Sequence, residues 1–145
     1  MSNGSVSMGQ FTRDPGDWLR KLTPDEWIRA ALAELRKAEA AYASGDGRGG
    51  SAGVKRAAGM ALNAALIVEP DEKWGRSYVE HVKALAEDGR VPQAVRDACR
   101  VVLEAKGPSG GVVSLRTPRA NEAVVEATKD VIAHAFAVVK RHETA

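Results

Sequence analysis

The stretch SAGVKRAAGMALNAALIVEP, residues 51–70, limits the possible folds more than any other part of the sequence. Its apolar residues occupy more than one side of a helix, and a helix that is apolar on several sides is buried centrally. Many of these residues are alanine or glycine, so neighbouring backbones can approach closely and a large side chain would overpack the contact. We therefore predict a central helix that ends at Glu69 and Pro70 and is surrounded by other helices.

Composition agrees with a small helical domain. The chain has 145 residues, about one domain, and 44% of them are hydrophobic. Only three Trp, two Tyr and two Phe are present, so alanine, valine and leucine must fill the core. The net charge of +2 is too small to indicate a nucleic-acid groove by itself, so any phosphate-binding surface has to be local.

The first helix has a clear beginning in the sequence TPDEW. Thr23 can cap it, Pro24 suits the first turn, and Glu26 completes a capping box with Thr23. Apolar residues then recur every three or four positions, which predicts one buried stripe. The stripe consists of Ile28, Ala31, Leu32, Leu35, Ala38 and Tyr42. The segment GDGRGG, residues 45–50, lacks the strand and the Gly-Lys-Ser/Thr of a phosphate-binding loop, so we expect a flexible turn there.

Three further helices are expected, over residues 74–87, from Pro92 to before Gly107, and over residues 121–142. An irregular connection, residues 106–119, precedes the last of them. No stretch alternates convincingly as a strand. The sequence therefore predicts an all-α fold, an up-and-down bundle of four to five helices over residues 23–145, preceded by a flexible N-terminal lead over residues 1–22.

Arg76 and His81 are the strongest candidates for catalytic residues. They are five residues apart, and five residues of an α-helix turn through about 500°, which leaves the two side chains about 140° apart around the axis. One isolated helix therefore cannot direct both at one point. If they are catalytic, they must meet across an interface or around a kink.

Asn63, Arg116 and Arg119 are candidates for ligand binding. Asn63 is the polar residue of the central helix and is either a hydrogen-bonded core amide or a ligand contact; the structural role is favoured. The two arginines of the connection could reach a phosphate or an acidic partner, although arginines scattered in loops are usually solvated.

Other reactive residues give weaker indications. Cys99 lies in an apolar stretch and is expected to be a buried structural thiol. Asp130 and His134 are four residues apart, so the carboxylate could raise the pKa of the imidazole, but a surface or boundary pair is the favoured interpretation. The three histidines form no local metal-binding unit with one another, and we expect neither a metal nor a cofactor. No apolar run of about eighteen residues and no signal-like start are present, so we expect a cytoplasmic protein without membrane contact.

The order of the segments resembles that of the HEPN domains, named for higher eukaryotes and prokaryotes nucleotide binding. The resemblance covers about Pro24 to His142. It rests on the segments WIRAALAELRKAEAAY, AGVKRAAGMALNAAL, SYVEHVKAL and EAVVEATKDVIAHAFAVV. It implies an up-and-down bundle that pairs as a homodimer. Members include toxin ribonucleases, companions of nucleotidyltransferases, and inactive binding modules.

The resemblance also implies two alternative functions. Family ribonucleases carry an arginine, four to six residues and then a histidine, and Arg76 to His81 fits this spacing. They place that motif near the start of the final long helix, whereas here it lies earlier in the chain. We therefore predict a non-enzymatic domain that dimerises and binds a partner protein, such as a nucleotidyltransferase, or a nucleotide-bearing ligand. The alternative is a metal-independent endoribonuclease, possibly a toxin, that acts on RNA through Arg76 and His81.

Overall fold

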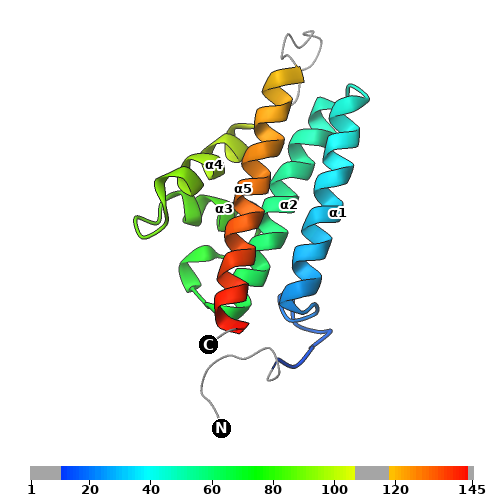
Figure 1. Cartoon of the computed structure of the whole chain (residues 1–145). Helices are drawn as coiled ribbons and strands as arrows, with labels where there is room; N and C mark the ends of the chain where they lie inside the picture. Colours follow the sequence, from blue (N-terminus) through cyan, green and yellow to red (C-terminus); the bar gives the residue numbers. More distant parts are fainter. Residues whose placement is uncertain (1–10, 107–117, 144–145) are drawn as a thin grey trace.

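The computed structural model describes residues 11–106 and 118–143 (Figure 1). Within these residues the chain forms α-helices, one 3-10 turn and no strand, which confirms the predicted all-α bundle. The elements are α1 (Pro24–Ala43), α2 (Gly47–Val68), η2 (Glu72–Trp74), α3 (Tyr78–Ala86), α4 (Gln93–Glu104) and α5 (Pro118–Glu143).

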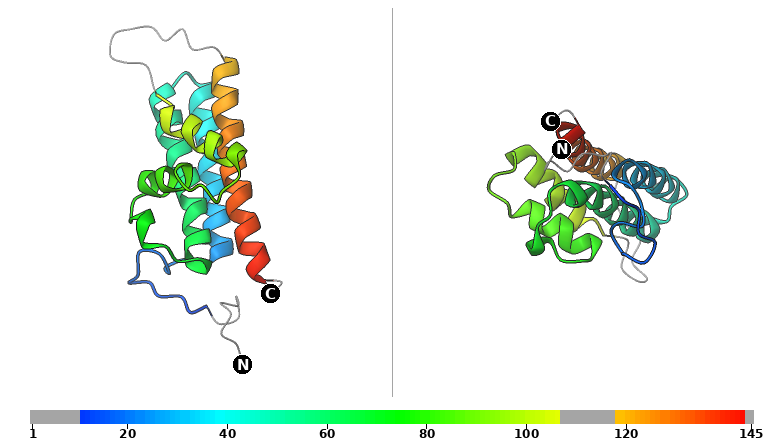
Figure 2. Two further views of the ribbon diagram at one scale, coloured as in Figure 1. Left: turned by 90° about the vertical axis from the view of Figure 1, so that its left-hand side faces the viewer. Right: turned by 90° about the horizontal axis from the view of Figure 1, so that it is seen from below.

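The long helices α1, α2 and α5 lie side by side, and the short helices α3 and α4 pack obliquely against one side of them (Figures 1 and 2). α2 is the central element, because it contacts α1, α3, α4 and α5. α1 packs mainly on α2 and α5, whereas α3 and α4 lie on the side of the bundle away from α1. The outer side of α1 and α5 is therefore left uncovered by the other described helices.

The small residues of α2 allow this central position. Fifteen of its 22 residues are buried, as the sequence predicts. A Cβ atom added to Gly59 would lie 2.1 Å from the Cβ of Tyr78 at the start of α3. One added to Gly53 would lie 2.8 Å from the Cβ of Ala38 on α1. The bundle therefore closes around α2 at distances that only glycine permits.

α1 begins as expected, because the capping box of Thr23 and Glu26 is present. The hydroxyl of Thr23 accepts a hydrogen bond from the amide of Glu26 at 3.1 Å, and the Glu26 carboxylate accepts one from the amide of Thr23 at 2.8 Å. The expected buried stripe is wrong at Leu32, which is 40% exposed on the outer side of the helix. Tyr42 is half-buried.

The starts of α2 and α5 differ from the sequence prediction. α2 begins at Gly47, because the carboxylate of Asp46 caps it by accepting a hydrogen bond from the amide of Gly49 at 2.8 Å. The flexible turn expected over residues 45–50 is therefore wrong for Gly47 onward. α5 begins at Pro118, so Arg119 lies in its first turn.

Residues 11–22, assigned to the N-terminal lead, contact the bundle. Leu19 is buried, and its carbonyl accepts a hydrogen bond from the indole Nε1 of Trp27 at 2.7 Å. Arg13 forms an ion pair with Glu26 at 2.7 Å. These contacts place Trp18 against the junction that precedes α3.

The close contact at Gly59 makes a clear prediction. Replacing a helical glycine by alanine normally stabilises a helix by about 0.5–1 kcal/mol. We expect Gly59→Ala to lower the free energy of unfolding instead, by about 1–3 kcal/mol, because the new methyl group overlaps Tyr78. Urea denaturation measures this change.

Gly89→Ala is the matched control, because a Cβ atom at Gly89 would meet no atom within 4 Å. Its free energy of unfolding should stay close to that of the wild type. A Gly59→Ala variant as stable as Gly89→Ala would contradict the close packing of α2 on α3.

Candidate functional site

The segment between α2 and α3 bends twice. Asp71 caps η2 by accepting a hydrogen bond from the amide of Lys73 at 2.9 Å. Gly75 follows with φ at +67°, a left-handed conformation that favours glycine. Ser77 then caps α3 in a second capping box, with Glu80. The helix predicted over residues 74–87 is therefore confirmed for Tyr78–Ala86 and wrong before it, because this turn separates η2 from α3 and leaves Arg76 outside both.

The bend brings Arg76 and His81 to a common neighbour. The guanidinium carbon of Arg76 lies 5.3 Å from the ring centroid of Trp18. The imidazole of His81 stacks on the same indole, with 5.9 Å between the ring centroids. The two residues therefore share Trp18 of the N-terminal segment, residues 11–22, as a neighbour, and no direct contact joins the guanidinium to the imidazole.

His81 is enclosed in the core at 0% exposure. Its Nδ1 lies 2.8 Å from the carbonyl oxygen of Trp74, and because a carbonyl can only accept, Nδ1 carries the hydrogen. Its Nε2 is buried without a hydrogen-bond partner. Burial lowers the pKa of His81, against the opposing effects of the Trp74 carbonyl and Glu80. The imidazole is therefore neutral at pH 7.

Arg76 and His81 differ sharply in access to solvent. Arg76 is exposed, whereas His81 lies beneath Trp18 and beside Trp74, whose ring centroid is 6.1 Å away. A general acid or base must come within hydrogen-bond distance of the group whose proton it transfers. The imidazole cannot do so with a phosphodiester in this conformation.

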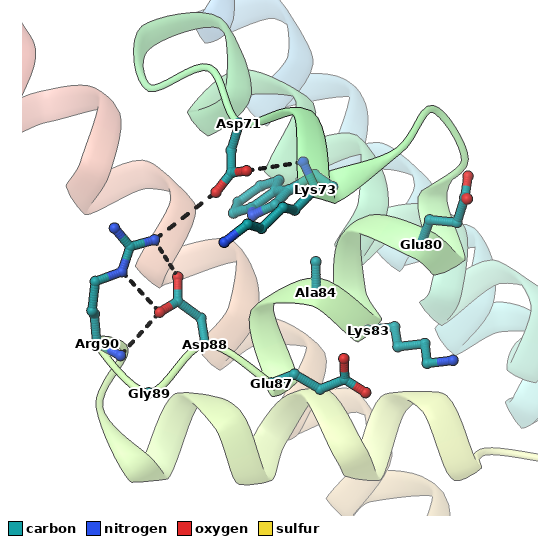
Figure 3. Close-up of a pocket in the computed structure, with 10 residues that line it drawn as sticks. Asp71, Lys73, Glu80, Lys83, Ala84, Glu87, Asp88, Gly89 and Arg90 are labelled. Carbon is teal, nitrogen blue, oxygen red and sulfur yellow. Dashed lines mark hydrogen bonds and ion pairs between the residues drawn. The ribbon is translucent and has the colours of Figure 1, made fainter.

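A cavity of about 620 Å³ has Trp74 in its lining (Figure 3). Its polar lining contains more carboxylates than basic groups. The carboxylates are Asp71, Glu80, Glu87 and Asp88, and the basic groups are Lys73, Lys83 and Arg90. Such walls do not provide the surplus positive charge that a phosphate requires.

Two of these groups are already paired. The guanidinium of Arg90 donates two hydrogen bonds to Asp88, at 3.0 and 2.8 Å, and lies 3.9 Å from Asp71 (Figure 3). The hydrogen bonds from Arg90 lower the pKa of Asp88 to about 2. This pair lies in the turn between α3 and α4 and closes one end of the cavity.

A neighbouring cavity of about 360 Å³ shares Asp71, Trp74, Asp88 and Arg90 with the first one and is also lined by α5. Glu69 lies at its edge and accepts hydrogen bonds from the Arg141 guanidinium at 2.7 Å and from Nε2 of His142 at 2.8 Å. Burial acts to raise the pKa of Glu69, but these two partners outweigh it and lower the pKa.

His134 also lines this second cavity. Burial is the main cause that lowers its pKa, followed by the charge of Arg141. Asp130 is exposed and is not among the groups that shift this pKa, which agrees with the favoured interpretation of Asp130 and His134 as a surface or boundary pair.

The remaining candidates do not join this site. Asn63 is 1% exposed, its Oδ1 has no hydrogen-bond partner, and it lines neither cavity. Arg119 is exposed at the far end of α5, and Arg116 lies outside the described residues. Cys99 is buried, as predicted, and burial raises the pKa of its thiol to about 12, so it is unreactive.

Sequence reasoning missed Trp18, Trp74 and the Asp88–Arg90 pair. Trp18 was assigned to the N-terminal lead and Trp74 to the start of a helix, so neither was considered beside His81. Three tryptophans in a chain this poor in aromatics were the available signal, because such large side chains concentrate where the core or a site needs area.

Among the residues that the structure describes, no three His, Cys, Asp or Glu side chains are placed to hold a metal ion. In the same part of the chain, no helix combines the length and apolar character needed to cross a membrane. Comparison of the chain with family models, curated proteins and solved structures finds no match.

The buried imidazole predicts how stability depends on pH. The unfolded chain binds a proton at His81 near pH 6.5, whereas the folded chain binds it only at lower pH. The contribution of the neutral His81 to the free energy of unfolding is therefore complete above about pH 6.5, and it is lost as the pH falls below that value. Urea denaturation at pH 7 and pH 5 should show this loss.

His81→Asn keeps a donor near the Trp74 carbonyl but removes the titrating group, so we expect lower stability at both pH values and a weaker dependence on pH. His134→Gln measures the separate contribution of the other histidine whose pKa is lowered. An unchanged pH dependence in His81→Asn would contradict a buried neutral imidazole.

Proposed function

We propose that the chain is a cytoplasmic, non-enzymatic HEPN-like domain that forms a homodimer and binds a partner protein. The observation that carries this proposal is the state of His81. Its imidazole is enclosed, neutral and hydrogen-bonded to the Trp74 carbonyl. These are properties of a structural core residue, and they leave the Arg76–His81 pair without an accessible acid or base.

The charges of the cavity in Figure 3 favour a protein over a nucleotide-bearing ligand. Asp88 holds the Arg90 guanidinium at one end, so that cation is not available for a phosphate. Lys73 and Lys83 share this lining with Glu80 and Glu87, and the charge of Lys73 also acts on Asp88. A cationic side chain of a protein suits these walls better than a phosphate does. A nucleotidyltransferase-type partner remains a proposal from the family resemblance.

One observation supports the alternative of a metal-independent endoribonuclease. Arg76 and His81 both lie against one indole, that of Trp18. In that mechanism His81 acts as general acid or base and Arg76 stabilises the charge of the transition state. The N-terminal segment would first have to move away, since Trp18 covers the imidazole.

RNA cleavage separates the two proposals. We expect no cleavage when the purified protein is incubated with single-stranded and structured RNAs. The variants Arg76→Ala, His81→Ala and His81→Asn are incubated in parallel, with Arg48→Ala as a control at an exposed arginine of α2. Circular dichroism verifies that each variant is folded.

Wild-type cleavage that is lost in Arg76→Ala and in a folded His81 variant, yet kept in Arg48→Ala, would overturn the non-enzymatic proposal. Light scattering at micromolar concentration tests the homodimer, and a mass of 15.4 kDa, that of one chain, would contradict it.

A further inference from the structure

We propose that two copies of this chain pair through the outer face of α1 and α5, with α5 antiparallel to α5 of the second copy. This inference rests on the homodimer proposed above and assigns it a surface. We define the α1/α5 face by Asp25, Leu32 and Glu39 on α1 and by Glu126, Lys129, Ala133, Phe136 and Lys140 on α5.

The face is the exposed side of the three-helix layer. α3 and α4 cover the opposite side of the bundle, and α1 packs mainly on α2 and α5 (Figures 1 and 2). Two of the four large apolar side chains that are exposed among the described residues lie here, Leu32 at 40% and Phe136 at 43%. The other two are Val79 on α3 and Val101 on α4.

Charges across the two helices show that Leu32 and Phe136 share this face. The pKa of Lys140 is raised by its hydrogen bond to Glu143 and also by the charge of Asp25 on α1. The pKa of Lys129 is raised by Glu126 and also by Glu39 on α1. Both ends of the face thus bring α1 carboxylates near α5 ammonium groups.

The apolar residues lie between these ends. Leu32 is seven residues from Asp25 and seven from Glu39, so the three align along one side of α1. Phe136 lies between Lys129 and Lys140, and the Lys140 ammonium is 5.1 Å from its ring centroid. The face therefore has an apolar centre and charged ends, the usual composition of a protein interface.

The charges on α5 are self-complementary under a twofold rotation. Glu126 and Lys140 each lie seven residues from Ala133, on the same side of the helix, so the three form one row. An antiparallel pairing centred on Ala133 brings Glu126 next to Lys140 of the second copy, and Lys140 next to its Glu126. A twofold interface requires this reciprocity, and the exposed alanine lets the helices approach.

The partners of these two charges within one chain are local and exposed. Glu126 pairs with Lys129 at 2.9 Å, and Lys140 pairs with Glu143 at 2.8 Å, both at a spacing of three residues. Such surface pairs are weak, so exchanging them for pairs between copies costs little.

The face is also hollowed at its acidic end. A groove of about 520 Å³ lies where α1 ends and α5 begins, and its lining includes Glu39, Tyr42, Glu122, Val125 and Glu126. In the antiparallel pairing this groove receives the end of α5 of the second copy that carries Lys140. The acidic end of one copy then meets the basic side chain of the other.

The size of the face suits a small dimer interface. Helices of 20 and 26 residues are roughly 30 and 39 Å long, and two packed helices are about 20 Å wide, which gives an area on the order of 600 Å² per copy. This is the lower end of the range for specific interfaces. An interface of that size should respond strongly to single charges.

Charge reversal tests the pairing. Glu126→Lys and Lys140→Glu each place like charges opposite one another twice in the dimer. We expect each to raise the dimer dissociation constant about tenfold at low salt. The double variant Glu126→Lys/Lys140→Glu restores opposite charges, so its dissociation constant should return close to the wild-type value. Sedimentation equilibrium measures these constants.

Apolar substitutions provide the matched comparison. Phe136→Asp should leave the protein monomeric, whereas Val79→Asp, at a valine that is 47% exposed on α3, should not change the dissociation constant. Circular dichroism and thermal unfolding of each variant distinguish lost dimerisation from lost folding.

The outcomes separate this inference from the homodimer itself. A monomeric wild type would contradict the proposed dimer. A dimer that resists Glu126→Lys, Lys140→Glu and Phe136→Asp would leave the dimer standing and overturn the α1/α5 face. Dissociation by Val79→Asp would likewise overturn the face and assign the interface to α3. A double variant whose dissociation constant stays as high as those of the single variants would contradict the antiparallel pairing.

Discussion

The rest of this structure depends on how closely α1 and α3 pack on α2, at positions where α2 carries glycine. Gly59 lies against the backbone of Tyr78, and Gly53 lies against Ala38, so α3 and α1 both approach α2 more closely than larger side chains would allow. Alanine, valine and leucine have small side chains, so each buries little apolar surface. The helices must therefore pack closely to bury enough apolar surface in total. The same contact positions the start of α3, and with it the turn that carries Arg76.

Two of the three tryptophans of the chain surround His81. The imidazole occupies the core with tryptophans on two sides, Trp18 from the N-terminal segment and Trp74 from η2. Burial keeps it neutral, and the Trp74 carbonyl satisfies the nitrogen that carries the hydrogen. The N-terminal segment is therefore part of the folded unit, because without Trp18 the second side of the imidazole would lose its covering ring.

Several charged side chains of the described residues form ion pairs. Glu69 with Arg141, Asp88 with Arg90, and the short-range pairs on α5 each neutralise themselves. The Asp88–Arg90 pair belongs to the lining of the cavity in Figure 3, so the charge of that guanidinium is already neutralised there.

The sequence by itself determined what depends on helical period and local capping. It predicted the all-α class, the central α2, the capping box of Thr23 and the burial of Cys99, because each follows from neighbours within a few residues. Only the tertiary structure decided what depends on distant segments: the place of Leu32 on an outer face, and the contacts of Arg76 and His81 with Trp18. Residues far apart in the chain create those environments, and periodicity carries no information about which helix face meets which.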